Sequence, residues 1–423
     1  MSGGKMDADV SVIGLGRVGL PLALAFAGHG LRVIGIERDP ARLDALRAGT
    51  MPFDEPGAQE ALDAALEAGL LEFSCAVPDA ARAESVVITI GTPSFTHLEI
   101  DIRDIRAVID ELLPVIRGRS LILRSTVAPG TTEFVAGYLQ QKQGLVPGRD
   151  VFVAHVPERI ATGRFFEEIE TLPIIVGGLE SASTQRAVDL FSCFGGRIVP
   201  TSPVQAELAK IWANIVRYAD FALPNLLMMD CERYGANVFD VIELINRDYP
   251  RGGIARPGFT AGTCLRKDFA FSEERSNAPG MLLAVSRVNE SVPHFLVEGI
   301  KRRIGSLAGL KIGVLGLAFK RDTDDERDSL AHKLIRLLER ELADVAVHDP
   351  FVATPTLGFE EAVRDADVVV VAANHSAFDG LEPLKLIYKL AKPDCVVVDP
   401  WNTFGIAQVF AGPDEAGSRK EML

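Results

Sequence analysis

The chain of 423 residues has few cysteines, and none of the five is paired as Cys-x-x-Cys. Scattered cysteines argue against a disulfide framework and a structural zinc site, and they suit a reducing compartment. Long apolar runs are also lacking, since none approaches the roughly 18 residues that a membrane span requires. The opening Met-Ser-Gly-Gly-Lys lacks the apolar core of a signal peptide. We therefore expect a cytoplasmic protein with no metal site and no membrane partner.

Positive charge is scarce, with 44 Lys and Arg against 58 Asp and Glu and a net charge of −14. This balance argues against a nucleic-acid-binding surface. It also means that local cations, rather than the overall field, would have to hold an anionic substrate. A chain of this length exceeds one hydrophobic core, so two to three domains are expected.

The N-terminal segment has the order of a dinucleotide-binding turn. An apolar run at residues 9–13 precedes Gly14-Leu-Gly-Arg-Val-Gly19, a helical pattern to residue 28, and a second apolar run ending at Glu37. Strand, glycine turn, helix, strand and acid form the context that this fingerprint requires. Its glycines permit a tight turn, close approach of a pyrophosphate and close helix packing, and the helix N–H groups meet the phosphates. The alternative is a tight turn without a ligand. The predicted cofactor contacts are Gly14, Gly16, Arg17, Val18, Gly19, Glu37 and Arg38.

Glu37 lies 18 positions after Gly19, where a carboxylate accepts hydrogen bonds from the ribose hydroxyls and repels a 2′-phosphate. This favours NAD over NADP. The neighbouring Arg38 is the counter-argument, because an arginine can accommodate that phosphate.

Later strands end in polar motifs. Runs at 85–90, 120–123 and 151–153 lead into Gly-Thr92-Pro93, Arg-Ser-Thr126 and His155-Val-Pro-Glu158-Arg159, respectively. Open α/β sheets bind ligands at these strand ends. Plain turns with capping hydroxyls are the alternative, and His155 reads equally as a satisfied strand-end histidine or as a ligand-facing one.

Residues 202–234 show a long helical pattern interrupted only by Pro224. At 1.5 Å per residue such a helix is about 45 Å long, too long for one small domain. We expect it to bridge two α/β domains and to offer an apolar face to a second copy. Glu207, Lys210 and Asn214 share one helical face, which could also be a solvated salt-bridged stripe.

The segment Phe259-Thr-Ala-Gly-Thr-Cys264-Leu-Arg-Lys-Asp268 places a cysteine among small residues and an aspartate four positions later. A reachable thiol with a nearby charge and proton acceptor has this appearance. A buried, inert cysteine is the alternative.

The C-terminal part reads as a second α/β unit. Residues 310–320 suggest a strand and a glycine turn, followed by strands at 345–348, 367–371 and 395–398. The turn lacks the third glycine of the fingerprint and precedes a highly charged segment, so a second NAD site is not favoured. The tail after Gly412 is expected to be disordered.

Taken together, the fingerprint, Pro157-Glu158, Lys210 with Asn214, and the Cys264 segment resemble the UDP-glucose/GDP-mannose dehydrogenase family, the nucleotide-sugar 6-dehydrogenases. The resemblance covers nearly the whole chain. It implies two Rossmann-like α/β domains joined by a central helical region with one long connecting helix, at residues 1–200, 201–300 and 301–423. It also implies NAD, a homodimer, and a role in polysaccharide or glycoside biosynthesis.

The implied reaction is a four-electron oxidation of the C6 alcohol of a UDP-sugar to a UDP-uronate, through a cysteine thiohemiacetal and thioester. Lys210 and Asn214 would stabilise the oxyanion, and Thr126 and Asp268 would hold a water, with Glu158 as candidate base. The implied catalytic residues are Cys264, Lys210, Asn214, Asp268, Thr126 and Glu158. The implied contacts with the nicotinamide side are Thr92, Pro93 and Thr126. The implied substrate contacts are Glu158, Arg159, Lys210, Asn214, Arg247, Phe259, Gly262, Lys320 and Arg327, with Arg247 crossing the dimer interface.

Several residues depart from the family pattern. Glucose- and mannose-type members usually read Pro-Glu-Phe-Leu-x-Glu-Gly, whereas here Arg159 follows the first glutamate and Thr162 replaces the second. This looks more like the UDP-N-acetylhexosamine branch, with UDP-glucose, dTDP-glucose and GDP-mannose as alternatives. Ala261 and Arg266 replace a glycine and a proline, and Trp401 lies where the family's Asp-x-Arg carries arginine. Arg266 would contact a substrate phosphate or face solvent.

Two other readings stay open. A two-electron dehydrogenase of the 6-phosphogluconate or 3-hydroxyacid type also combines the fingerprint with a lysine and asparagine helix, but has no use for the thiol segment. A non-catalytic nucleotide-sugar-binding protein would keep the fold without the six implied catalytic residues.

Overall fold

The computed structural model describes residues 7–92, 103–260, 262, 264–273 and 280–412. The chain divides into two compact units. The first comprises residues 1–213 and 270–275, and the second comprises residues 214–269 and 276–423.

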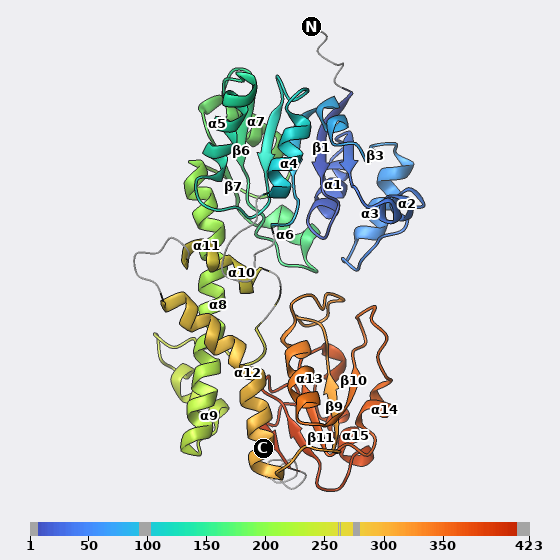
Figure 1. Ribbon diagram of the computed structural model, residues 1–423, viewed down its shortest axis with the longest axis vertical. Helices are drawn as coiled ribbons and strands as arrows, with labels where there is room; N and C mark the ends of the chain where they lie inside the picture. Colours follow the sequence, from blue (N-terminus) through green and yellow to red (C-terminus); the bar gives the residue numbers. More distant parts are fainter. Residues whose placement is uncertain (1–6, 93–102, 261, 263, 274–279, 413–423) are drawn as a thin grey trace. The chain divides into compact units, whose positions relative to one another are not determined.

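An eight-stranded sheet forms the centre of the first unit (Figure 1). Its order is β3-β2-β1-β4-β5-β6-β7-β8, and only the β6–β7 pair is antiparallel. The first six strands have the 3-2-1-4-5-6 order of a dinucleotide-binding fold, in which ligands bind beyond the carboxyl ends of the strands. The strands are β1 (Ala8–Ile13), β2 (Val33–Ile36), β3 (Leu71–Ser74), β4 (Ala83–Ile88), β5 (Ser120–Leu123), β6 (Phe152–His155), β7 (Ile174–Gly178) and β8 (Ile198–Thr201).

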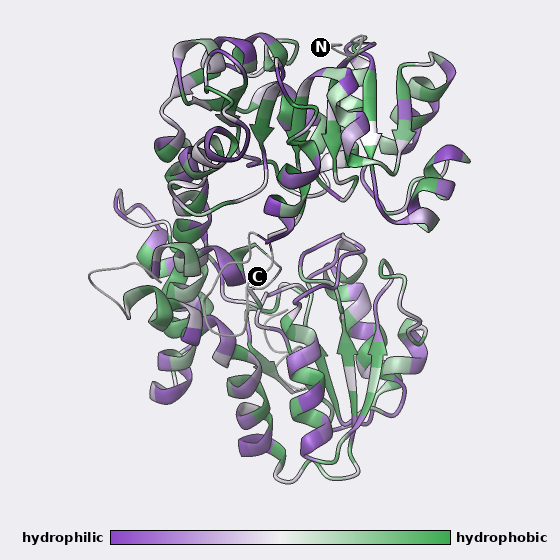
Figure 2. Cartoon of the chain, turned by 45° about the horizontal axis from the view of Figure 1, so that its top comes forward, coloured by the Kyte–Doolittle hydropathy of each residue, from purple (hydrophilic) through white to green (hydrophobic). Residues whose placement is uncertain are grey.

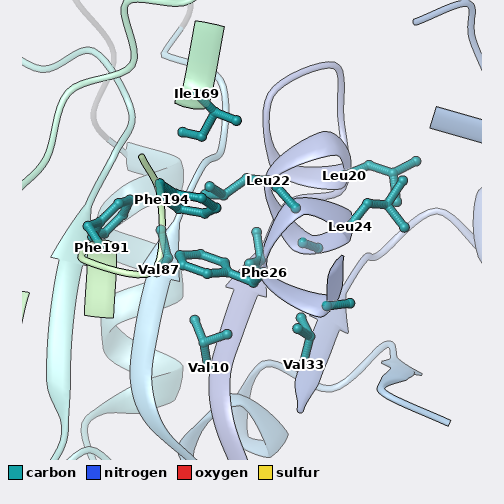
Figure 3. Close-up of a cluster of buried hydrophobic side chains, with 14 of the residues drawn as sticks. Val10, Leu20, Leu22, Leu24, Phe26, Val33, Val87, Ile169, Phe191 and Phe194 are labelled. Carbon is teal, nitrogen blue, oxygen red and sulfur yellow. The ribbon is translucent and has the colours of Figure 1, made fainter. Parts of the chain in front are cut away.

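Both faces of this sheet are buried. Successive residues of a strand point to opposite faces, so Ile122 joins one hydrophobic cluster while Leu121 and Leu123 join the other. In the first cluster, Phe26 packs against Phe191 and Phe194 with ring centroids 5.5 and 5.0 Å away (Figure 3). The helices of this unit are α1 (Gly19–Gly28), α2 (Pro40–Arg47), α3 (Ala58–Glu67), the 3-10 helix η1 (Val77–Arg82), α4 (Arg103–Leu112), α5 (Thr131–Gln143), α6 (Phe165–Thr171), α7 (Ser181–Phe191) and α11 (Ala270–Glu273).

The second unit contains a five-stranded sheet in the order β10-β9-β11-β12-β13, parallel except for β13. Its strands are hydrophobic along most of their length, like those of the first sheet (Figure 2). They are β9 (Lys311–Leu315), β10 (Asp344–His348), β11 (Val368–Val371), β12 (Val396–Val398) and β13 (Phe410–Ala411). The helices are α9 (Val238–Asn246), α10 (Leu265–Asp268), α12 (Met281–Ile304), α13 (Leu330–Arg340), α14 (Phe359–Val363), α15 (Leu381–Leu390) and the 3-10 helix η2 (Ser376–Phe378).

The helix α8 (Pro203–Tyr234) has 32 residues, and its residues belong to both units. It continues through Pro224. The expected pair of α/β sheets with one long helix is thus confirmed. Among the described residues, no helix is both long and apolar enough to cross a membrane. The predicted disorder of the tail concerns residues outside the described range.

Candidate active site

The glycine turn after β1 has the geometry of a pyrophosphate cradle. Gly14 has φ +94°, a value that disfavours other residues. A Cβ atom on Gly19 would lie 1.9 Å from the Gly14 carbonyl oxygen, so α1 packs directly on the turn. At Gly16, by contrast, a Cβ would meet nothing within 4 Å. No side chain caps α1 at Val18, and the N-terminus of a helix that follows such a turn suits a phosphate.

Glu37 follows β2 and is bound to the glycine turn. Its carboxylate accepts the N–H of Leu15 at 3.1 Å, the N–H of Arg38 at 2.8 Å and the guanidinium of Arg42 at 3.0 Å. The Arg38 guanidinium pairs instead with Glu111. Arg17 lies over the ring of Phe53 at 5.0 Å from its centroid. The acid therefore lies at the turn, as the ribose contact requires, and the residues present fit a bound NAD.

The loops that follow β4 and β5 are joined to each other. The hydroxyl of Thr92 donates to the carbonyl of Thr126 at 2.7 Å, and that of Ser125 donates to the carbonyl of Ile90 at 2.7 Å. Thr92 is buried and Thr126 half-buried. The structure thus brings these two predicted residues together, while Pro93 lies outside the described residues.

Glu158 forms a buried ion pair that no local sequence pattern indicates. Its Oε2 accepts from both Nε and Nη2 of Arg124, at 3.0 and 2.5 Å, and its Oε1 accepts from the N–H of Ile160 at 2.7 Å. The two side chains are 3% and 11% exposed. Arg124 is 34 residues away and opens the motif that contains Thr126, so only the shared sheet edge could have suggested the pairing.

The loop after Glu158 is held by carboxylates from elsewhere in the first unit. Glu55, which is 5% exposed, accepts the N–H groups of Gly163 and Phe165 at 2.9 Å each. Glu168 accepts the N–H of Ala161 at 2.8 Å. Arg159 donates to the carbonyl of Pro173, and burial lowers its pKa. Glu55 was also missed, since it is 108 residues from Gly163.

His155 ends β6 and is fully buried. Burial, together with the nearby charges of Arg124 and Lys210, lowers its pKa to about 3. Neither ring nitrogen has a hydrogen-bond partner among the described residues. The histidine therefore stays uncharged, and it is not the satisfied strand-end residue that one reading of the sequence gave.

On α8, Glu207 fixes the helix to the loop that carries Thr126. Its fully buried carboxylate accepts the N–H of Gly130 at 2.7 Å and both the N–H and hydroxyl of Thr132, at 2.9 and 2.6 Å. Burial is the main cause that raises its pKa. Lys210 lies one turn further on and is 8% exposed. The solvated-stripe reading is therefore wrong for Glu207 and Lys210.

The acid of the cysteine segment is shared between two donors. Asp268 is fully buried and accepts from the amide of Asn214 at 2.5 Å and from the ammonium of Lys267 at 2.8 Å. Its N–H donates to the carbonyl of Cys264 at 2.9 Å. Cys264 itself is exposed, so the expectation of a buried cysteine is wrong.

A cation lies near the sulfur. The pKa of Arg327 is raised, mainly by its hydrogen bonds to Asp325 at 2.8 and 2.6 Å and to a smaller extent by the charge of Cys264. Lys320 follows the glycine turn after β9 and is half-buried. Arg247 is exposed and pairs with Glu243 at 2.6 Å.

Two other residues of the segment have structural surroundings. Phe259 is 4% exposed and belongs to a hydrophobic core cluster of the second unit. Arg266 donates to Glu290 at 2.6 Å and to the carbonyl of Asp328 at 3.1 Å. Arg266 is therefore paired within the protein and does not only face solvent.

The second glycine turn lies after β9, and an aspartate after the neighbouring strand binds its N–H groups. Asp349 follows β10 and accepts the N–H groups of Leu317 and Ala318 at 2.6 and 3.0 Å, and His375 lies 3.1 Å away. Its side chain is fully buried, and its pKa is lowered by the hydrogen bonds from His375 and the backbone against the opposing effect of burial. This carboxylate is thus bound by the backbone of its own turn and by His375. The described residues contain no group of three or more His, Cys, Asp or Glu side chains suited to hold a metal ion.

A doubly wound sheet with an open glycine turn and an acid after the second strand defines a dinucleotide-binding protein. Family models of the UDP-glucose/GDP-mannose dehydrogenase family match three segments. The NAD binding domain matches residues 8–195, the central domain 204–291 and the UDP binding domain 313–405.

Individual relatives agree. The UDP-N-acetyl-D-mannosamine dehydrogenase of Pyrococcus horikoshii is 33% identical over 382 residues, which cover 87% of this chain and 90% of that protein. The structure of the P. horikoshii enzyme has a TM-score of 0.86 at 31% identity, covering 92% of this chain and 94% of the other. A UDP-glucose dehydrogenase from Pyrobaculum islandicum has a TM-score of 0.82 at 30% identity, covering 95% of each chain.

The chain therefore belongs to the UDP-glucose/GDP-mannose dehydrogenase family. It is an NAD-dependent nucleotide-sugar dehydrogenase. The resemblance, the cofactor and the fold class inferred from the sequence are confirmed.

Proposed function

We propose that this enzyme oxidises the C6 alcohol of a UDP-N-acetylhexosamine to the corresponding UDP-uronate in two successive two-electron steps. The observation that carries this proposal is the exposed thiol of Cys264 beside the Asn214–Asp268–Lys267 hydrogen bonds. A thiol is needed because covalent capture keeps the intermediate aldehyde from escaping. The choice of sugar is supported by Arg159 and Thr162 after Glu158 and by the name of the P. horikoshii relative. UDP-glucose is the alternative, followed by dTDP-glucose and GDP-mannose.

NAD, when bound, supplies the hydride acceptor for both oxidations, so two are consumed for each product. Gly14, Gly16, Val18 and Gly19 would hold its pyrophosphate and Glu37 its ribose. Arg17, Arg38, Thr92, Pro93 and Thr126 complete the proposed cofactor contacts.

In the first oxidation, Lys210 and Asn214 stabilise the negative charge that develops on the C6 oxygen. The thiolate of Cys264 then adds to the aldehyde carbon, and the carbonyl oxygen takes up a proton to give a thiohemiacetal. Oxidation of this adduct leaves a thioester on the sulfur. Arg327 keeps positive charge near that sulfur.

Hydrolysis of the thioester needs a positioned water. Thr126 and Asp268 are assigned to hold it, and Glu158 is the candidate general base. Arg124 keeps Glu158 in place, and Oε1 of Glu158 retains a lone pair beyond its hydrogen bond with Ile160. The new carboxylate leaves and the thiolate is regenerated. Substrate contacts are assigned to Glu158, Arg159, Lys210, Asn214, Arg247, Phe259, Gly262, Lys320 and Arg327.

A homodimer through α8 is part of the proposal. Exposed apolar side chains recur along this helix at Leu208, Trp212, Val216, Leu223 and Leu226. Their spacing puts them on one helical face, and such a stripe on a soluble protein marks an interaction surface.

We also propose domain boundaries near residues 200 and 300, a cytoplasmic location and a role in polysaccharide or glycoside biosynthesis.

A substrate panel tests the function. The enzyme is incubated with NAD and UDP-GlcNAc, UDP-ManNAc, UDP-GalNAc, UDP-glucose, dTDP-glucose or GDP-mannose, and reduced cofactor is followed by absorbance. We expect the highest kcat/KM with a UDP-N-acetylhexosamine and two NADH for each uronate. One NADH for each product, or no NADH with any of the six, would overturn the proposal.

A further inference from the structure

Gly262 in the cysteine segment and Gly258 directly before the segment are each covered by an aromatic ring from a loop of the second unit. A Cβ built on Gly262 would lie 2.6 Å from Cδ2 of Phe319, and one on Gly258 would lie 2.3 Å from Cε3 of Trp401. Real Cβ atoms essentially never approach another heavy atom within 3.0 Å. Both rings therefore lie directly against the loop backbone, and all four residues belong to the second compact unit.

The two rings lie in the loops that follow the carboxyl ends of β9 and β12. The N–H of Phe319 donates to the carbonyl of Asp325 at 3.0 Å. The N–H of Trp401 donates to Asp399 at 3.2 Å, and its indole N–H donates to the carbonyl of Ala372 at 3.4 Å. Ligands of open α/β sheets bind at such strand ends. The edge that carries Lys320 thus also contacts the cysteine segment.

The segment is also fixed by the helices. The N–H of Gly258 donates to Oδ1 of Asn225 on α8 at 2.9 Å, and the amide of Asn225 donates to Asn289 on α12 at 2.9 Å. Both asparagines are fully buried. Satisfied buried polar groups of this kind specify one geometry. Gly258 is therefore held by a hydrogen bond from one side and by the Trp401 ring from another.

We propose that Phe319 and Trp401 are positioning residues for Cys264. The inference rests on the proposed function, in which the sulfur must reach the C6 carbon. Gly262 and Gly258 precede Cys264 by two and six residues, so a backbone shift at either glycine moves the thiol. Misplacement of a reacting group by about 1 Å can cost about 10²-fold in rate. Trp401 thus gives this chain a packing contact at the position where the family pattern carries arginine.

The test compares Phe319→Leu and Trp401→Leu with the matched control Phe359→Leu. Phe359 is on α14 in the same unit and packs against Phe378 and His348. In the full-length enzyme without substrate, the rate at which iodoacetamide alkylates Cys264 is followed by mass spectrometry of its peptide, with exposed Cys75 as internal reference. The kcat and the KM for NAD are then measured with the best sugar of the panel.

We expect both variants to change the Cys264 alkylation rate and to lower kcat by about tenfold or more, with the KM for NAD within about twofold. Phe359→Leu and the ring-preserving Trp401→Phe should alter neither quantity. Unchanged alkylation and kcat in a folded Phe319→Leu enzyme, or equal effects in Phe359→Leu, would overturn the inference. If Trp401→Leu does not fold, Phe319→Leu carries the test. A wild-type enzyme without activity refutes the proposed function instead, and the alkylation measurement still decides the positioning role.

Discussion

The carboxylate of Asp268 accepts a hydrogen bond from the amide of Asn214 at 2.5 Å. The other oxygen of Asp268 accepts from Lys267 at 2.8 Å. Asp268 lies on the short helix that begins directly after Cys264. One carboxylate therefore joins the helix that carries Lys210 and Asn214 to the turn that carries the nucleophile.

Asp268→Asn should remove most of the activity. An amide cannot accept on both sides as the carboxylate does, and Lys267 would lose the counter-charge of its side chain. We expect kcat to fall by about 10²–10⁴-fold, the range for loss of a proton-transfer or water-positioning group, with NAD binding unchanged by titration. Asp365→Asn is the control, because Asp365 is exposed and its φ of 55° is tolerated by asparagine. Near-normal kcat in Asp268→Asn would remove this residue from the mechanism.

The Arg124–Glu158 pair should behave as a buried salt bridge. Arg124→Met leaves the Glu158 carboxylate buried without its cation, which is expected to destabilise the fold by about 3–5 kcal/mol in urea denaturation. The double variant Arg124→Met/Glu158→Gln should lose less than the sum of the two single variants, because neither charge remains. Arg164→Met breaks an exposed pair with Glu167 and should cost less than about 1 kcal/mol. Strict additivity in the double variant would mean that the two side chains do not interact.

Glu37→Gln should weaken the preference for NAD. The neutral amide no longer repels a 2′-phosphate, and Arg42, which now pairs with Glu37 at 3.0 Å, becomes available to bind one. Initial rates with both cofactors should show the NADP to NAD ratio of kcat/KM rise by about tenfold or more. Glu72→Gln, an exposed change on β3, should leave the ratio unaltered. No change in the ratio for Glu37→Gln would mean that Glu37 does not contact the ribose.

His155 predicts a pH dependence of stability. In the unfolded chain its pKa is about 6.5, whereas burial lowers it to about 3 in the fold. The unfolded state therefore binds more protons between these values. The contribution of His155 is fully present above pH 6.5 and is lost as the pH falls toward 3, by up to about 1.4 kcal/mol per pH unit.

Urea denaturation between about pH 4 and 7 should show this slope reduced in His155→Gln, whatever the cost of the substitution itself. The exposed His294 offers the control His294→Gln, for which the slope should match the wild type. An identical slope in His155→Gln would mean that the imidazole is protonated inside the fold.

Periodic and local features of this chain could be predicted from its sequence. The pattern of residues 9–37 predicts a strand, a glycine turn, a helix and an acid, because each of these elements depends on neighbours within a few positions. The structure has β1, α1 and β2 in this range. The strand β8 was missed because it is short and none of its residues is buried. The strand β7 ends in two glycines that weaken any strand pattern.

Contacts between distant residues could not be predicted. The carboxylate of Glu55 reaches Gly163 and Phe165, the guanidinium of Arg124 reaches Glu158, and the Trp401 ring covers Gly258. Each contact depends on how the strands and helices are placed by tertiary packing, and nothing in the local pattern encodes the partner. The family resemblance supplied the catalytic candidates, but not the groups that hold them.

In the proposed mechanism, Cys264 carries the intermediate between the two oxidations. The most direct test of this role is product analysis of Cys264→Ser with saturating NAD and the preferred UDP-sugar, using chromatography to detect the uronate. We expect no UDP-uronate from this variant, with NAD binding as in the wild type. Formation of UDP-uronate at the wild-type rate, with two NADH for each product, would contradict it.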